Sequence, residues 1–239
     1  PQGMPGDHWI ARDIPLYSPQ EPVHIPVSQP MNQMLSSVAR AVANSIENRR
    51  WDAHRVFSEQ LVDRIFCHQL LSHCPECASR LWIGYRPWPE ESTESIGYWV
   101  DGNADQPSLA LEVRVDDPRD DSAHESSAVW GRIIADVLRL ATALGHCQLG
   151  AGYVLLFGEL RPDESDTRIE QFPLTSAGET RRVSSHRLFA NSVMDQSFFE
   201  EIMHPREIVP ASINVQLVAA DDGPGIGFWI WRVSLPPDE

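Results

Sequence analysis

The chain has 239 residues, a formal net charge of −15 and a hydrophobic content of 42%. This length suits one large domain with a packed core. No apolar run approaches the roughly 18 residues of a membrane-spanning helix. No basic N-terminal stretch leads into an apolar one, so no signal peptide is expected. We therefore expect a cytoplasmic protein without a membrane segment.

All 19 basic side chains are arginines, and the chain contains no lysine. This excludes a Schiff-base lysine, a P-loop lysine and a lysine general base. The arginines are scattered along the chain, whereas a broad nucleic-acid footprint would show as a basic patch. The acidic balance favours solubility or a basic protein partner.

The first 30 residues hold seven prolines. Proline at this density prevents a helix and favours an extended chain. Apolar residues such as Trp9, Ile14, Leu16 and Ile25 lie between the prolines. We predict an arm that is ordered by contact with this chain or another, and the alternative is a loose tail.

Two helices are expected after the arm. Apolar residues recur at steps of three and four over 31–46, which is typical of one buried helical stripe. Asp52 can cap a second helix that carries Phe57, Leu61 and Phe66 and ends before Pro75.

Three short strands are then predicted at 81–86, 96–100 and 109–115. In the third, Leu109, Leu111, Val113 and Val115 share one face, while Ala110, Glu112 and Arg114 share the other. We predict that the apolar face packs against the following helix. Glu112 and Arg114 would then lie on the opposite, solvent-facing side, with Arg114 paired to a carboxylate.

The strongest helix signal covers 123–144. It opens with a capping box from Ser122 to Glu125, carries an apolar stripe with Trp130 and Ile134, and stops at Gly145. The unbroken apolar run at 153–157 predicts a strand that is covered on both faces.

The remainder reads as β-rich. Weak strands are expected at 168–174 and 182–189, a short helix at 194–203, and strands at 212–218 and 226–235 around a turn at 221–225. The last strand places Trp229 and Trp231 on one face, with Phe228 and Ile230 on the other. These tryptophans either fill the core or bind a partner, and the proline arm or another chain would cover the outer face.

Together these elements predict an α+β fold with a central mixed sheet flanked by the helices near 52–71 and 123–144. We divide the chain into a proline-rich arm (1–30), an α/β core (31–160) and a β-rich C-terminal part (161–239) that packs on the core.

The order helix, three strands, helix, strand over 52–158 resembles the core of the PD-(D/E)xK nuclease-like superfamily. In that family an Asp and a Glu hold a divalent metal, and a Lys two residues after the Glu helps to activate water. The resemblance implies Asp101 and Glu112 as Mg²⁺ ligands, Arg114 at the lysine position and Glu59 as a further carboxylate. Arginine stays protonated, so it is a poor proton acceptor. An alternating strand also turns polar residues outward without any site, and both interpretations stay open.

The four cysteines do not form a disulfide framework in a chain of this length. Cys74 and Cys77 have the spacing of a zinc knuckle, with Cys67, His68 and His73 nearby, but a second Cys-x-x-Cys pair is missing. Cys147 with His146 could complete a site only if the fold brings them close. A redox role is disfavoured because the motif follows a helix instead of opening one. We therefore predict buried or incidental thiols and no tightly bound zinc.

No complete catalytic motif is present. The sequence favours a non-catalytic, acidic partner-binding or assembly protein without a cofactor, in which Trp229 and Trp231 are the candidate partner-binding residues. The alternative is a Mg²⁺-dependent nuclease, or a degenerate relative of one, with Asp101, Glu112 and Arg114 at its site.

Overall fold

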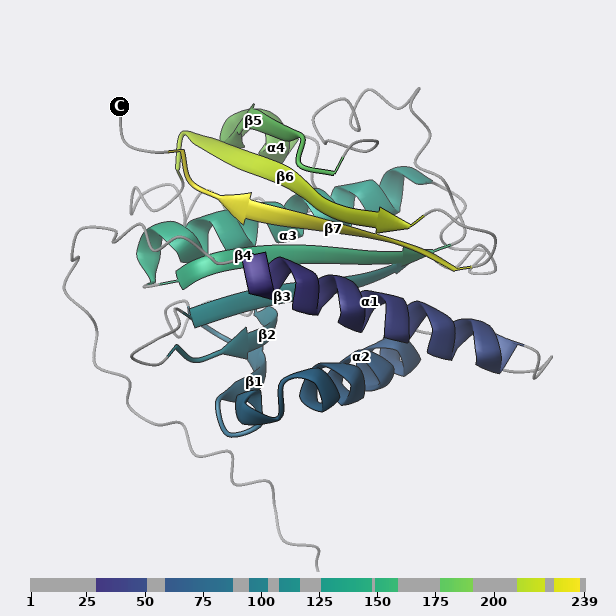
Figure 1. Cartoon of the computed structure of the whole chain (residues 1–239). Helices are drawn as coiled ribbons and strands as arrows, with labels where there is room; N and C mark the ends of the chain where they lie inside the picture. The colour runs from purple at the N-terminus through teal and green to yellow at the C-terminus, as the bar shows by residue number, and fades with distance from the viewer. Residues whose placement is uncertain are drawn as a thin grey trace, which may run out of the picture.

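The computed structural model is an α+β fold in which a seven-stranded mixed sheet lies between two helical layers (Figure 1). This confirms the fold class predicted from the sequence. The residues that the structure describes are 29–50, 59–87, 95–102, 108–116, 126–147, 149–158, 177–190, 210–221 and 226–236.

The elements follow one another in the order α1 (Gln29–Arg50), α2 (Glu59–His73), the 3-10 helix η1 (Pro75–Cys77), β1 (Leu81–Tyr85), β2 (Ile96–Val100), β3 (Ser108–Asp116), α3 (Ser126–His146), β4 (Leu149–Gly158), β5 (Thr180–Ser184), α4 (Ser185–Ala190), β6 (Ser212–Asp221) and β7 (Gly227–Ser234).

The spatial order of the strands is β1-β2-β3-β4-β7-β6-β5. Strands β3 and β4 run parallel, joined by the crossover helix α3, and all other neighbours are antiparallel. Because β7 pairs with β4, the C-terminal strands extend the sheet of the core by hydrogen bonding. Strands β1 and β5 form the two edges.

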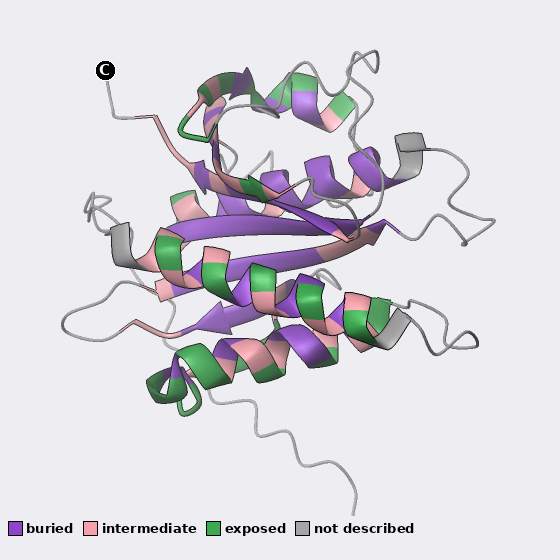
Figure 2. Ribbon diagram, turned by 45° about the vertical axis from the view of Figure 1, so that its right-hand side comes forward, coloured by how far each residue is buried: buried purple, intermediate pink, exposed green. Residues whose placement is uncertain are grey.

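Helices α1 and α2 cover one face of the sheet (Figure 1). The apolar stripe of α1, which includes Leu35, Val38 and Val42, is fully buried, and Figure 2 shows exposed residues along the outer side of the same helix. The Tyr153 hydroxyl of β4 donates a 2.7 Å hydrogen bond to Asn32 Oδ1 of α1. This contact joins the helix to the middle of the sheet.

Helix α3 covers the other face, and α4 lies against α3. Trp130 of α3 meets Trp231 of β7 edge to face, with ring centroids 5.9 Å apart. Strand β4 divides its side chains between the two layers: Tyr153 and Leu155 face α1 and α2, while Val154 and Leu156 face α3. This confirms that its apolar run is covered on both sides. Within the described ranges, no helix has the length and hydropathy needed to cross a membrane.

The prediction for the two faces of β3 is wrong. Leu109, Leu111 and Val113 pack toward α1 and α2, whereas Ala110 packs toward α3. The alternation of β3 was read correctly, but alternation alone does not say which helix covers which face. Two helices, α1 and α2, occupy the leucine face.

The predicted cover of β7 is also corrected. Phe228 and Ile230 lie in the cluster that α1 and α2 cover, so α1 covers this strand in place of the arm or another chain. Trp229 and Trp231 face α3 and retain only 3% and 0% exposure. Their indoles fill the core and are not presented to a partner.

Several boundaries differ from the predictions. The segment expected as one strand at 182–189 splits into β5 and α4, and α3 continues past Gly145 to His146. Strands β4 and β6 are longer than predicted. The arm up to residue 28, the Asp52 cap, the Ser122 capping box, the strand at 168–174, the helix at 194–203 and turn residues 222–225 lie outside the described residues.

Candidate functional site

Arg114 lies at the centre of a charged cluster that joins β3, α2 and α3. Its Nε and Nη2 donate to Asp136 Oδ2 and Oδ1 at 2.6 and 2.8 Å. Its Nη1 donates to Glu59 Oε1 at 2.7 Å. The sequence predicted a carboxylate partner for Arg114, but it placed the pair on the face away from α3 and missed Asp136, a buried residue of α3 itself.

The register of β2 explains how one guanidinium reaches both helical layers. Tyr98 pairs with Leu111 in an antiparallel register, so Ile96, the first residue of β2, lies opposite Val113. Arg114 follows one position later, beyond the end of β2. Its side chain can therefore contact α3 on one side of the sheet and α2 on the other.

A second arginine, Arg139, completes the cluster. It donates to Asp136 Oδ1 from the next turn of α3, and its Nε lies 3.7 Å from Glu112 Oε1. The side chain of Asp136 is fully buried, so its charge is balanced by two arginines. Burial lowers the pKa of Arg114, but the hydrogen bond and the charge of Asp136 outweigh it and raise the pKa overall.

Glu112 is the most perturbed acid of the cluster. Burial raises its pKa to about 8, and the Asp136 charge adds to this, while Arg139, Arg114 and the Gly97 N–H oppose it. The site therefore favours the neutral form of this carboxyl. A Cβ at position 97 would lie 3.0 Å from Glu112 Oε2, so glycine at this position allows the close approach.

Glu112 is thus buried beneath α3, and the expectation of a solvent-facing Glu-Arg strand is wrong. Only 4% of Glu112 is exposed, because the face of β3 that carries it packs toward α3. The cluster binds its carboxylates internally through arginines. In this part of the chain, as in the other described ranges, no group of three His, Cys, Asp or Glu side chains has an arrangement that could hold a metal.

Asp101 belongs to a different site. Its Oδ2 accepts a 2.7 Å hydrogen bond from Trp82 Nε1, and its Oδ1 accepts a 3.0 Å bond from Trp99 Nε1. The register places Asp101 opposite Ser108, four residues from Glu112, which is about 13 Å along the strand. The fold therefore does not bring Asp101 and Glu112 together.

Cys74 and Cys77 form a disulfide across η1, with Cα atoms 5.4 Å apart. The expectation of incidental thiols at these two positions is corrected. Cys67 and Cys147 carry thiols, and burial raises the pKa of both. The absence of tightly bound zinc stays a prediction.

One feature of β1 was missed by sequence reasoning. Among the described residues, the large hydrophobic side chains that are exposed are Trp82 (43%) and Ile83 (68%), which are neighbours on this edge strand. Gly84 follows with φ 65°, a left-handed conformation inside a strand. A glycine within a strand often marks a bulge or an edge, and it is the signal that the sequence offered.

Comparison of the chain with protein-family models, with curated proteins and with solved structures finds no match in any of the three.

Proposed function

We propose that this chain is a non-catalytic partner-binding or assembly protein that acts in the cytoplasm and uses no cofactor. The observation that carries the proposal is the edge strand β1, where Trp82 and Ile83 expose apolar surface. Consecutive residues of a strand point to opposite faces, so each face of this edge strand offers one exposed apolar side chain. A strand at the edge of a sheet is also a template for pairing with another chain. Tryptophan is also frequent among the residues that dominate binding energy.

The geometry of Trp82 supports this assignment. Its indole N–H is held by Asp101, so the ring is fixed in one orientation before any partner arrives. A fixed aromatic side chain loses little conformational entropy when it is covered, which favours binding.

The distribution of charge refines the expected partner. The described ranges hold 13 arginines and 10 carboxylates, a formal charge of +3, so the rest of the chain holds 6 arginines and 24 carboxylates, a formal charge of −18. The acidity that favours a basic partner therefore belongs to the residues outside the described ranges. We propose that a protein partner contacts β1 through apolar side chains and that a basic partner surface would meet the acidic segments.

Site-specific photo-crosslinking in cells that express the chain tests this proposal. A crosslinking side chain at the exposed position Arg86, beside β1, should give one discrete protein adduct. Ile83→Asp should reduce its yield at least about tenfold, because a buried carboxylate would oppose docking. A crosslinker at Ser184 on the opposite edge serves as the matched control. Equal adduct patterns from both edges, unchanged by Ile83→Asp, would contradict the proposal.

A further inference from the structure

The segment between α2 and β1 combines a disulfide with a chain of hydrogen bonds that leads to the exposed Trp82. Cys74 and Cys77 flank Pro75 and Glu76, both exposed, while the two cysteines are 6% and 4% exposed. The Cys74 N–H continues the hydrogen bonding of α2 by donating to Leu70 O at 2.9 Å. The disulfide therefore fixes the turn by which the chain leaves the helix.

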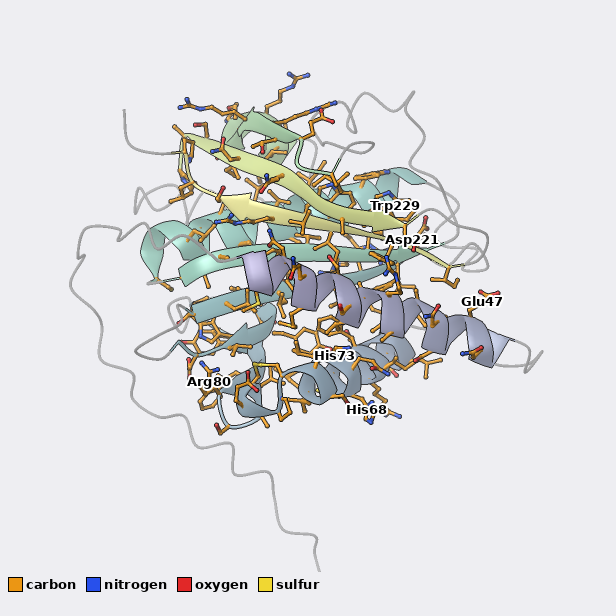
Figure 3. All side chains as sticks on the ribbon, in the orientation of Figure 1. Glu47, His68, His73, Arg80, Asp221 and Trp229 are labelled. Atoms are coloured by element: carbon orange, nitrogen blue, oxygen red, sulfur yellow. A yellow bond between two sulfur atoms is a disulfide. The ribbon has the colours of Figure 1, made fainter. Side chains whose placement is uncertain are left out.

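The contacts run without a gap from this turn to β1. The Arg80 N–H donates to Cys77 O at 2.9 Å, and the Asp101 N–H donates to Arg80 O at 2.9 Å. Arg80 Nη1 also donates to Asp101 O at 2.8 Å, and Figure 3 shows Arg80 beside this turn. The carboxylate of Asp101 then accepts from the Trp82 indole.

Trp99 provides an internal comparison for this path. It donates to the same Asp101 carboxylate, but its ring is 5% exposed and stacks on Tyr85 at 4.7 Å. Core packing holds Trp99 in place whatever happens to the turn. Trp82 lacks that support, so its orientation depends on Asp101 and on the residues that position Asp101.

We infer that Cys74 and Cys77 form a reversible thiol–disulfide site whose oxidation state sets the order of Trp82 at the β1 edge. The inference rests on the proposed function, because it assigns a regulation to the same edge. Its substrate class is a cellular dithiol.

The reaction is a two-electron exchange. A thiolate of the dithiol attacks one cysteine sulfur, the Cys74–Cys77 bond breaks, and the other cysteine leaves as a thiolate that takes up a proton. The second thiol of the reductant then displaces the first cysteine, so the reductant becomes a disulfide and the protein gains two thiols. Because both sulfurs are buried, η1 must open locally before the attack.

The thiols of the chain itself do not compete. Cys67, two turns earlier on α2, has its pKa raised by burial and by Asp63. Burial raises the pKa of Cys147 to about 11. Both are therefore mostly thiols at neutral pH and poor nucleophiles for disulfide exchange.

Indole hydrogen exchange, followed by ¹⁵N NMR on the full chain, tests the inference. The Trp82 signal is assigned with Trp82→Phe, and the protein is compared oxidised, treated with dithiothreitol, and as the double variant Cys74→Ser/Cys77→Ser. Reduction and the double variant should each speed Trp82 indole exchange by at least about fivefold, which corresponds to a loss of about 1 kcal/mol in local stability. The exchange of the Trp99 indole should stay unchanged.

The controls separate the possible failures. Cys67→Ser should respond to dithiothreitol as the wild type does, since Cys67 lies outside the disulfide. Equal Trp82 exchange in all states would overturn the coupling while leaving the crosslinking test of the β1 edge untouched. Four titratable thiols in protein purified without reductant, or zinc retained on Cys74 and Cys77, would overturn the disulfide site itself. Accelerated exchange of both indoles would show general loosening and would likewise overturn the inference.

Discussion

The face of the sheet under α1 and α2 and the face under α3 are closed by different chemistry. Apolar side chains fill the first, whereas the second also buries Glu112 of β3 and Asp136 of α3. Neighbouring residues of one strand serve the two faces, since Leu111 points to the first and Glu112 to the second. A packed apolar face tolerates changes of shape, whereas a buried ionic cluster depends on each partner being present.

The largest effect is expected from Asp136→Ala. This substitution leaves Arg114 and Arg139 partly buried without the carboxylate that both contact. Breaking a buried ion pair in this way costs about 3–5 kcal/mol of unfolding free energy. Urea denaturation measures it. Asp221→Ala is the matched control, because its pair with Arg40 is 3.9 Å long and exposed, and such pairs contribute about 0–1 kcal/mol. Equal losses from both variants would refute the special role of the cluster.

On the apolar face, Leu111→Ala should destabilise the fold by about 2–5 kcal/mol, since it opens a cavity at a fully buried site. Leu111→Met, which keeps most of the volume, should cost less than about 1.5 kcal/mol. Denaturant midpoints of the two variants check this. If Leu111→Met lowered the free energy of unfolding as much as Leu111→Ala, the apolar face would tolerate changes of side-chain shape no better than the ionic cluster tolerates the loss of a partner.

Glu112→Gln should stabilise the protein at neutral pH. The folded-state pKa of Glu112 is raised to about 8 from a usual 4.5, so its contribution to stability is present below pH 4.5 and is lost as the pH rises to 8. Glutamine resembles the neutral carboxyl but cannot ionise, so the variant does not lose stability as the pH rises. Its free energy of unfolding at pH 7 should exceed that of the wild type by on the order of 1–3 kcal/mol. Melting temperatures measured from pH 4 to 9 should diverge as the pH rises. Parallel curves would contradict the assignment.

The smallest expected effect is that of Mg²⁺. Asp101 and Glu112 lie four residues apart along paired strands and are held by indoles and arginines, so the ion should not change the melting temperature or allow cleavage of DNA or RNA. A Mg²⁺-dependent rise in melting temperature that disappears in both Asp101→Asn and Glu112→Gln would support the nuclease alternative. It would also show that Glu112 binds a metal and is not only part of a buried ionic cluster.

Much of the fold could be predicted from local patterns. Periodicity placed α1, α2, α3 and strands β1, β2, β3, β6 and β7 within a few residues, because each of these elements buries a stripe or face that repeats in the sequence. The unbroken run of β4 indicated cover on both sides for the same reason. These signals depend only on neighbouring residues.

The candidate site could not be predicted in the same way. The resemblance singled out Arg114 and Glu59, which pair although they lie 55 residues apart, but Asp136, 22 residues after Arg114, was missed. Which face of β3 meets which helix depends on packing between distant segments, so Glu112 read as exposed although it is buried. The exposure of Trp82 likewise follows from the position of β1 at the edge of the sheet, and Gly84 within the strand is its one local signal.

The position of α1 in the fold has a consequence for folding during synthesis. This helix is the first described element to leave the ribosome, yet it packs against β7, the last strand, as well as against β4, whose Tyr153 lies 121 residues after its partner Asn32. Contacts this distant in sequence form late and slow folding. Helix α2, which follows directly, can pack against α1 early. The contacts of α1 with β4 and β7 form only after nearly all the described chain has been made, so part of its apolar surface stays exposed until then.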